Sequence, residues 1–154
     1  RLTTDNGLNL RLNPNDGSVV GGTLDGPING LPGGSTGVSA AAYTNNFAGA
    51  TATTLYTLDA TSNSLCIQEP ANNGTQTTIV GVTLGGAALD FDEVNGFDIP
   101  RTVTVTTTGA QATGAGLAAL TVGGVASLYT IDLTTGVATL LVPAPPPTRG
   151  LTGG

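Results

Sequence analysis

The sequence of 154 residues contains no histidine, no lysine, no methionine and no tryptophan, and only one cysteine. Without histidine or lysine, the chain lacks the usual general bases and the amine nucleophile of covalent catalysis. A Ser-His-Asp triad is impossible, and no His/Cys metal cluster and no Gly-x-x-x-x-Gly-Lys phosphate loop occurs. We therefore predict that the protein is not an enzyme.

The single cysteine, Cys66, can form no disulfide within the chain. It lies in the apolar stretch "SLCIQ", where the simplest interpretation is a small buried hydrophobic residue. A nucleophilic role would require a base that lowers the thiol pKa, and histidine is absent.

Charge is also scarce: charged residues make up 9% of the chain, and the net charge is −6. The four basic residues, Arg1, Arg11, Arg101 and Arg149, are scattered. A nucleic-acid partner would need a basic stripe, and a membrane surface would need a basic amphipathic face. No apolar run approaches the roughly 20 residues that span a bilayer. The sequence thus predicts no nucleic-acid binding and no membrane insertion.

What the chain does contain is typical of β-structure. Hydrophobic residues make up 39% but aromatic residues only 4%, and there are 24 glycines. Valine, isoleucine and threonine suit pleated strands, whereas glycine, asparagine and aspartate suit tight turns. The pattern predicts an all-β protein of antiparallel sheets built from repeated hairpins, with turns every 8 to 12 residues or so. The strands are expected at 38–44, 53–60, 64–70, 75–82, 97–100, 101–109, 116–124, 127–133 and 137–143.

Two segments are expected to be loops, 24–37 and 84–96, because both are irregular and rich in glycine. Within 101–109, Val103 and Val105 alternate with threonines, as in a strand with one buried face. At the start of the chain, Asn6-Gly7 lies between two short strand-like runs and predicts a hairpin.

The chain also repeats itself. "LYTLDATSNSLCI" (Leu55–Ile67) is echoed by "LYTIDLTTGVATL" (Leu128–Leu140), and "LRLNPNDGSVV" is a weaker third copy. Each copy reads as a strand, a turn started by an Asp or Asn side chain, and a return strand. Glycine in the turn would supply positive φ. The predicted structural turn residues are Asn13, Gly17, Asp59, Asp132 and Gly136.

The ordered blocks "LNLRLNP", "SAAAYTNN", "ATTLYTLD", "NGFDIP", "GLAALTVGG" and "SLYTIDLTTGVATLL" carry a resemblance. From Arg1 to about Val142 the chain resembles an uncharacterised secreted bacterial domain of unknown function. The resemblance implies a propeller-like fold of four-stranded blades, and it implies no catalytic residues. The family domain usually has a further N-terminal portion of repeats, which is missing here.

We therefore expect a single β-repeat domain over 1–154 that is propeller-like and incomplete in one chain. The expected parts are a partial first blade at 1–23, a second at 38–83, a third at 96–142 and a Pro/Gly-rich tail at 143–154. Propellers typically close with about four to eight blades. Neighbouring copies would then have to supply what one chain lacks, unless the chain is a processed fragment.

The acidic stretch "DFDEVNGFD" is the densest concentration of charge. Oxygen-rich loops can bind calcium, although the spacing here is not that of an EF-hand. Two interpretations stay open: a calcium site, or a solvated acidic loop with Asn95-Gly96 as its turn. No other cofactor is expected. The candidate metal ligands are Asp90, Asp92, Glu93, Asn95 and Asp98.

Two functions fit these observations. The first is an extracellular or cell-surface structural protein that self-associates through open β-edges into a filament, sheath or biofilm matrix. Low charge and the absence of lysine and methionine suit a durable extracellular material. The second is a secreted propeller-type module that binds a glycan or surface partner through the loops 24–37 and 84–96.

Overall fold

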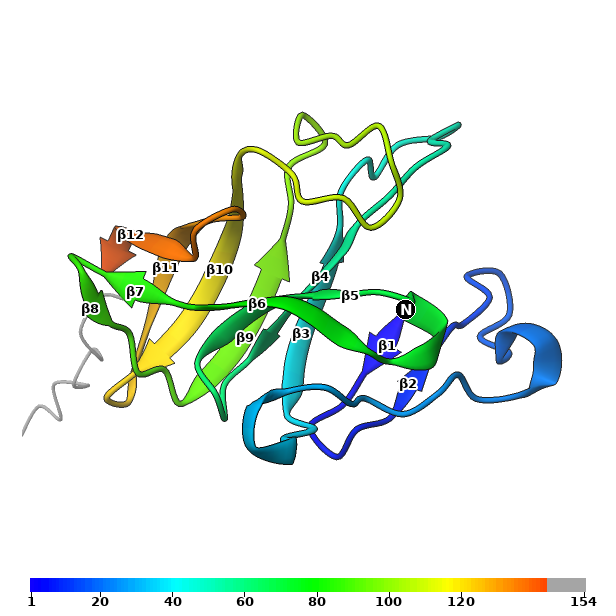
Figure 1. Ribbon diagram of the computed structural model, residues 1–154, viewed down its shortest axis with the longest axis horizontal. Helices are drawn as coiled ribbons and strands as arrows, with labels where there is room; N and C mark the ends of the chain where they lie inside the picture. Colours follow the sequence, from blue (N-terminus) through cyan, green and yellow to red (C-terminus); the bar gives the residue numbers. More distant parts are fainter. Residues whose placement is uncertain (144–154) are drawn as a thin grey trace, which may run out of the picture.

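The computed structural model describes residues 1–143, and its fold is all-β, as predicted (Figure 1). A small two-stranded sheet consists of β1 (Leu2–Thr3) and β2 (Asn9–Leu10), which form the hairpin around Asn6-Gly7. Three short 3₁₀ turns lie at Val20–Gly22, Pro32–Gly34 and Ala71–Asn73.

A four-stranded antiparallel sheet follows the chain without a crossover. Its strands, in spatial order, are β3 (Val38–Tyr43), β4 (Leu55–Asp59), β5 (Ser64–Gln68) and β6 (Gln76–Gly81).

The six-stranded sheet combines a second antiparallel meander with a short hairpin. The hairpin joins the meander through a parallel pairing of β7 with β12, so this sheet is mixed. Neither sheet closes into a barrel. In spatial order the strands are β8 (Ala87–Ala88), β7 (Thr83–Leu84), β12 (Val137–Pro143), β11 (Val125–Asp132), β10 (Ala115–Val122) and β9 (Glu93–Asp98).

The meanders β3–β6 and β9–β12 each have the strand order of a propeller blade. No ring is formed by the described residues, and a complete propeller therefore stays a prediction. The four strands of the expected second blade all lie within 38–83. Those of the third begin slightly earlier than expected, at Glu93, and end at Pro143. The rest of the predicted tail, 144–154, lies outside the described residues.

The main core lies between the two large sheets, where side chains from the facing sides of both sheets pack together. Strand alternation explains its membership, since every second residue of β4, β5, β10 and β11 points inward. The fully buried large side chains of this core are Tyr56, Leu58, Leu65, Ile67, Val82, Phe91, Ile99, Leu120, Ile131 and Leu133.

Residues 1–37, here called the N-terminal cover, lie on the other side of the four-stranded sheet, as the blue end of the ribbon shows (Figure 1). A small second cluster joins them to that sheet: Ile28 and Leu31 of the cover pack with Val38 and Cys66. The two central strands of the four-stranded sheet are thus covered on both faces, and every residue of β4 and β5 is buried.

Two expectations about strands were wrong. Segment 84–96 is not mainly loop, because it contains β8 and the start of β9, and Asn95-Gly96 lies inside β9. Segment 101–109 contains no strand. Val103 and Val105 are nevertheless buried in the main core. The Asn45 side chain accepts a hydrogen bond from the Val105 N–H (2.8 Å) and donates one to its carbonyl (2.9 Å). The Asn45 amide therefore pairs with the backbone N–H and carbonyl of Val105, which the sequence pattern predicted to be paired within a sheet.

Candidate interaction surface

The two repeated hairpins occupy different places in their sheets. Leu55–Ile67 forms β4 and β5, the second and third strands counted from β3. Leu128–Leu140 lies in β11 and β12, the third and fourth strands counted from β9. The repeat therefore marks a hairpin, and not the position of a strand within a blade.

Both hairpins turn around an aspartate. The Asp59 carboxylate accepts hydrogen bonds from the Thr61 N–H (3.0 Å), the Ser62 N–H (3.2 Å) and the Ser62 hydroxyl (2.5 Å). Asp59 is fully buried, so its carboxylate satisfies donors that have little access to water. The hydrogen bonds account for Asp59 without a catalytic role.

Asp132 makes the equivalent contacts. Its carboxylate accepts hydrogen bonds from the Thr134 N–H (2.9 Å), the Thr135 N–H (2.8 Å) and the Thr135 hydroxyl (2.9 Å). Burial opposes ionisation of this group, but the hydrogen bonds from Thr135 and Thr134 outweigh burial and hold the pKa of Asp132 below its ordinary value. Gly136 closes the turn with φ 73° and donates its N–H to the Asp132 carbonyl (2.9 Å).

The weaker third copy also contains a turn of this kind. The Asn13 side chain accepts a hydrogen bond from the Asn15 N–H (3.0 Å), and the Gly17 N–H donates to the Asn13 carbonyl (2.8 Å). Gly17 has φ 72°, which glycine adopts at no steric cost.

The tripeptide Leu-Tyr-Thr opens both of the stronger copies, and its burial differs between them. The tyrosines Tyr56 and Tyr129 both point into the main core. The residues that flank them point the other way. Leu55 and Thr57 are 2% and 0% exposed, whereas Leu128 is 38% exposed and Thr130 is half-buried. The first copy has a cover on its outer side, and within residues 1–143 the second has none.

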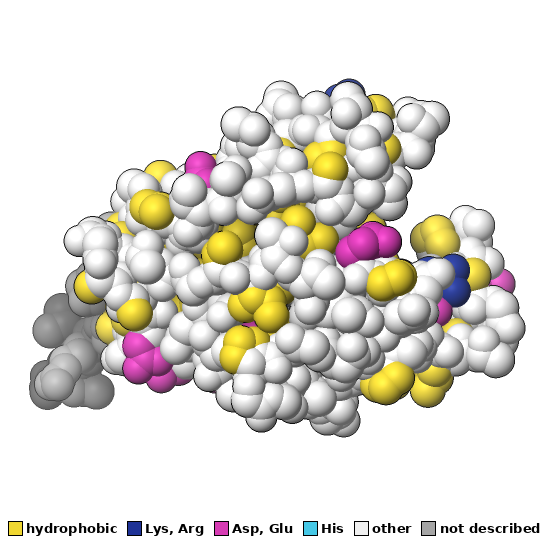
Figure 2. Space-filling view, viewed as in Figure 1, with side chains coloured by type: hydrophobic (Ala, Val, Ile, Leu, Met, Phe, Trp, Pro, Cys, Tyr) yellow, Lys and Arg dark blue, Asp and Glu magenta, His cyan; other side chains and the backbone are white. Residues whose placement is uncertain are grey.

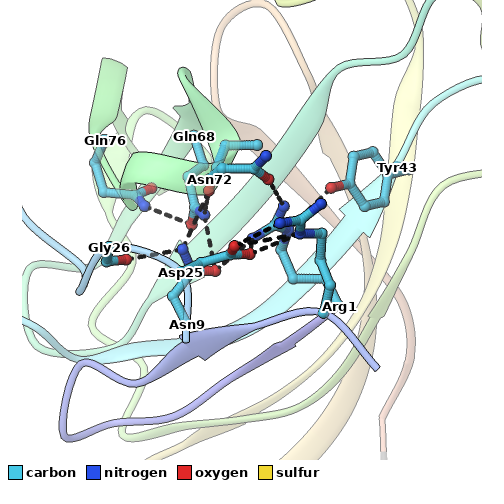
Figure 3. A network of polar contacts seen from close by, with 10 residues as sticks. Arg1, Asn9, Asp25, Gly26, Tyr43, Gln68, Asn72 and Gln76 are labelled. Carbon is cyan, nitrogen blue, oxygen red and sulfur yellow. Dashed lines mark hydrogen bonds and ion pairs between the residues drawn. The ribbon is translucent and has the colours of Figure 1, made fainter. Parts of the chain in front are cut away.

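A buried polar network joins the cover to the four-stranded sheet (Figure 3). The Asn9 side chain donates to the carbonyls of Gly26 (2.9 Å) and Ala71 (3.1 Å). Gln68 donates to the Asn9 oxygen (3.2 Å), and Gln76 donates to the Gln68 oxygen (2.8 Å). Among the described residues, no buried side-chain N or O atom lacks a hydrogen-bond partner. The network therefore has a structural role, which is to attach the cover to the four-stranded sheet.

An ion-pair cluster extends the same network (Figure 3). Arg1 donates to Asn9 (2.6 Å), Asp25 (3.0 Å), Asn72 (2.7 Å) and the Tyr43 hydroxyl (2.9 Å). The side chains of Arg1 and Asp25 are only 3% and 6% exposed.

Arg11 also binds Asp25 through both of its carboxylate oxygens. The hydrogen bonds from Arg11, with the nearby charge of Arg1, hold the pKa of Asp25 below its ordinary value although burial opposes this. No local sequence pattern indicates this cluster, because its members come together only when the cover folds onto the sheet.

The second copy lies on the uncovered side of the six-stranded sheet, here called the outer face. Residues directly opposite each other on neighbouring strands share a face, so the register of β10, β11 and β12 defines it. The outer face has apolar and hydroxyl side chains but no charged residue on these three strands, apart from Asp132, which is engaged by its turn. It consists of Leu117, Ala119, Thr121, Ala126, Leu128, Thr130 and Thr139.

Apart from Asp132, the carboxylates nearest this face lie at its border, on the edge strand β9. Glu93 lies opposite Thr121, and Asp98 lies opposite Leu117. Charged side chains are sparse over the molecule as a whole, and on the side shown in Figure 2 they occur in a few isolated places. The outer face is therefore a neutral surface on an acidic protein.

The sheet edges are less regular than the outer face. The pairing register shifts within β3, β6 and β9, and β6 contains Thr78 with φ 47°. The remaining edge strand, β8, has two residues. Bulges and very short edge strands hinder pairing with another chain. These edges are poor templates for strand addition.

The candidate calcium ligands are dispersed around β9. Asp90 accepts a hydrogen bond from the Asn63 side chain (2.9 Å), and Asn95 accepts one from the Thr121 hydroxyl (2.8 Å). Asp98 lies at the far end of the strand. Within residues 1–143, no three acidic, histidine or cysteine side chains form a group that could hold a metal ion. The calcium site therefore stays a hypothesis, without support from the geometry.

Asp92, Glu93 and Asn95 do line a hollow of about 460 Å³ together with Asp5 and Thr61. Its lining is polar and, among the described residues, contains no aromatic side chain. Sugar-binding surfaces commonly use an aromatic ring as an apolar platform, which this hollow lacks.

Cys66 is fully buried beneath the cover. Burial, with a smaller contribution from the charge of Asp59, raises the pKa of the thiol to about 12. The thiol is therefore protonated at neutral pH and unsuited to nucleophilic attack.

Comparison with known proteins places the chain in one family. No curated protein and no solved structure matches the chain. Within residues 1–143, no helix has both the length and the apolar character needed to cross a bilayer. Residues 1–151 match a family described as a domain of unknown function, in agreement with the resemblance seen in the sequence blocks. The chain belongs to this family, DUF4394.

Proposed function

We propose that the protein is an extracellular structural protein that self-associates, and that a second copy packs on the outer face of the six-stranded sheet. The observation that carries this proposal is the unequal burial of the repeated tripeptide. Leu55 is 2% exposed beneath the cover, and Leu128, at the same place in the repeat, is 38% exposed. The same sequence suits a covered surface in both places, but the part of the chain that the structure describes covers only one of them.

The charge distribution favours a second copy as the partner. The chain has a net charge of −6, so two copies repel each other through most orientations. On the outer face, strands β10, β11 and β12 present only neutral side chains around Leu117 and Leu128, and carboxylates lie at its border. Two copies can approach there without burying an unpaired charge.

Face-to-face packing is better supported than the pairing of open edges. Every edge strand of the large sheets is either short or interrupted in its register. By contrast, sheets with one apolar face commonly stack on one another, as the two large sheets do within this chain. We therefore place self-association on the outer face and not on the edges.

Sedimentation velocity over a wide concentration range tests this proposal. The variant Leu117→Glu/Leu128→Glu puts like charges on the outer face of each copy, and we expect it to remain monomeric while the native protein forms pairs. A control, Val20→Glu/Leu24→Glu, adds the same charge to exposed positions of the cover and should pair normally. A native protein that stays monomeric, or a charged face that associates like the native one, would disprove the proposal.

The alternative is a binding module for a glycan or surface partner. In its favour, the polar hollow brings together Gly37, Asp92 and Glu93 from the two segments proposed to bind. The lack of an aromatic lining makes it the weaker proposal. Specific retention of a glycan by the native protein, lost in Asp92→Asn/Glu93→Gln, would favour this alternative.

A further inference from the structure

We infer that the N-terminal cover hides a second interaction surface, the outer side of the four-stranded sheet, and that the outer face of another copy occupies it when the cover moves away. This inference rests on the proposed self-association. It assigns the cover a further role, which is to limit assembly to pairs.

The surface beneath the cover resembles the outer face chemically. Leu55 and Thr57 lie on it, as Leu128 and Thr130 lie on the outer face. Cys66 adds a neutral side chain, and the turn aspartate Asp59 ends this surface as Asp132 ends the outer face. The surface beneath the cover differs in having two amide side chains, Gln68 and Gln76. Both surfaces belong to sheets that already pack against each other through their opposite sides. A copy whose outer face met this surface would repeat the stacking of one sheet on another.

The apolar contact between cover and sheet is small. Of the cover, only Ile28 and Leu31 enter the second cluster, whereas the main core contains most of the buried hydrophobic residues of both large sheets. The rest of the attachment is polar. Gly26 donates its N–H to the Asn72 carbonyl (2.8 Å), and Asn29 donates its N–H to the Gly74 carbonyl (3.0 Å).

The ion pairs of Arg1 and Arg11 with Asp25 lie within the cover and move with it. The hydrogen bonds between cover and sheet can be replaced by water when the cover moves, because an intramolecular hydrogen bond contributes little net free energy. The cover is therefore the part of the described chain best able to separate while the main core stays intact.

Two glycines allow the backbone of the cover to lie in close contact with the segment that joins β5 to β6. A Cβ atom on Gly26 would lie 2.9 Å from the Asn73 carbonyl oxygen and 3.0 Å from its Cα. Gly26 does not adopt a positive φ, so alanine at this position would disturb the contact with Asn73 without straining its own backbone. At Gly74 a Cβ would collide with the Pro27 carbonyl, and its φ of 69° adds strain.

The number of available surfaces decides the form of the assembly. With the cover in place, each copy offers the outer face alone, and two such faces form a closed pair. With the cover displaced, each copy offers two different surfaces. Head-to-tail contact between them produces an open polymer wherever the rotation between copies does not close a ring. A filament would thus require release of the cover.

The test compares Gly26→Ala with Gly81→Ala in the full chain. Gly81 lies in β6, and a Cβ there meets nothing within 4 Å, which makes it the matched control. Cys66, the one cysteine of the chain, reports on the cover, because it is buried beneath it. We expect Gly26→Ala to raise the rate of Cys66 labelling about tenfold and to form polymers longer than pairs. Gly81→Ala should behave as the native protein does.

A third variant separates polymer from aggregate. Adding Leu117→Glu/Leu128→Glu to Gly26→Ala should leave Cys66 accessible but abolish the polymers, whereas misfolded aggregates would persist. Near-ultraviolet circular dichroism, which reports on Tyr56 and Tyr129 in the main core, should be unchanged in all variants.

Each outcome has a distinct meaning. If Gly26→Ala exposes Cys66 but assembly stops at pairs, this inference is wrong while the proposed self-association stands. The inference is also wrong if both Gly26→Ala and Gly74→Ala leave Cys66 protected, or if the native protein polymerises with Cys66 protected. A native protein that is monomeric at every concentration disproves the proposed function itself.

Discussion

The hairpins β4–β5 and β11–β12 share a sequence pattern but differ in their surroundings. In the first, every residue of both strands is buried, because the second sheet lies on one side and the N-terminal cover on the other. In the second, buried and more exposed residues largely alternate along β11, because residues 1–143 cover only one side of it. The same strand pattern therefore occurs in a hairpin that is covered on both sides and in one that is covered on one side. The exposed side of the second hairpin indicates where a partner fits.

The largest expected contrast is between Leu55→Ala and Leu128→Ala. Leu55 is 2% exposed, and its truncation should lower the free energy of unfolding by about 2–5 kcal/mol. In dilute, monomeric protein, Leu128→Ala should cost less than about 1 kcal/mol, because that side chain is 38% exposed. Urea unfolding followed by tyrosine fluorescence measures both. Equal losses in the monomer would show that the two surfaces do not differ in covering.

A smaller contrast is expected between the turns. Asp59→Ala leaves the N–H groups of Thr61 and Ser62 without their partner at a fully buried site, and we expect a loss of about 1–3 kcal/mol. Asp132→Ala should cost about 0.5–1.5 kcal/mol, because water can reach that turn. Thermal unfolding of both variants beside the native protein gives the comparison. A larger loss at Asp132 would contradict the burial argument.

Acid should loosen the cover before it unfolds the core. The pKa of Asp25 is held below its ordinary value by Arg11 and Arg1, so its contribution to stability is present above the ordinary aspartate pKa. That contribution is lost as the pH falls through the lower, folded-state pKa. We expect Cys66 to be modified faster by a dipyridyl disulfide as the pH falls below about 4.

Asp25→Asn provides the control for this pH dependence, because it removes the titrating group and keeps its size. In this variant Cys66 should be accessible already at neutral pH, and acid should change its labelling rate little. A steep acid response that persists in Asp25→Asn would assign the effect to other carboxylates.

Calcium should have the smallest effect. The acidic residues around β9 form no group of three that could share an ion, so millimolar calcium should not shift the melting temperature of chelator-treated protein. A saturable shift that disappears in Asp90→Asn/Asp92→Asn would instead restore the calcium hypothesis.

The sequence predicted the fold class and most strands because local patterns determine them. Alternation and turn residues identified the hairpins, including the one at Asn6-Gly7. It failed at 101–109, where Val103 and Val105 alternate with threonines as in a strand, because the Asn45 side chain takes the place of a neighbouring strand. That partner is about 60 residues away, and no local pattern reveals it.

The candidate surface could be predicted only in part. The repeat identified Leu128 and its neighbours, but only the folded chain shows that Leu55 is covered and Leu128 is not. The fastening of the cover was missed, since Arg1, Asp25 and Asn72 meet across most of the first half of the chain. Gln68 and Gln76 were the available signal: polar residues at the ends of apolar strands need buried partners.

The most direct test of the central claim is a cross-link through the middle of the outer face. Ala119 lies directly opposite Leu128 in the register of β10 and β11, so Ala119→Cys in a Cys66→Ala background places the only thiol there. We predict that mild oxidation links two copies rapidly at concentrations where the native protein pairs, and that Val20→Cys in the same background links slowly. Equal rates for the two positions, or no link through position 119, would contradict the claim that a second copy covers this face.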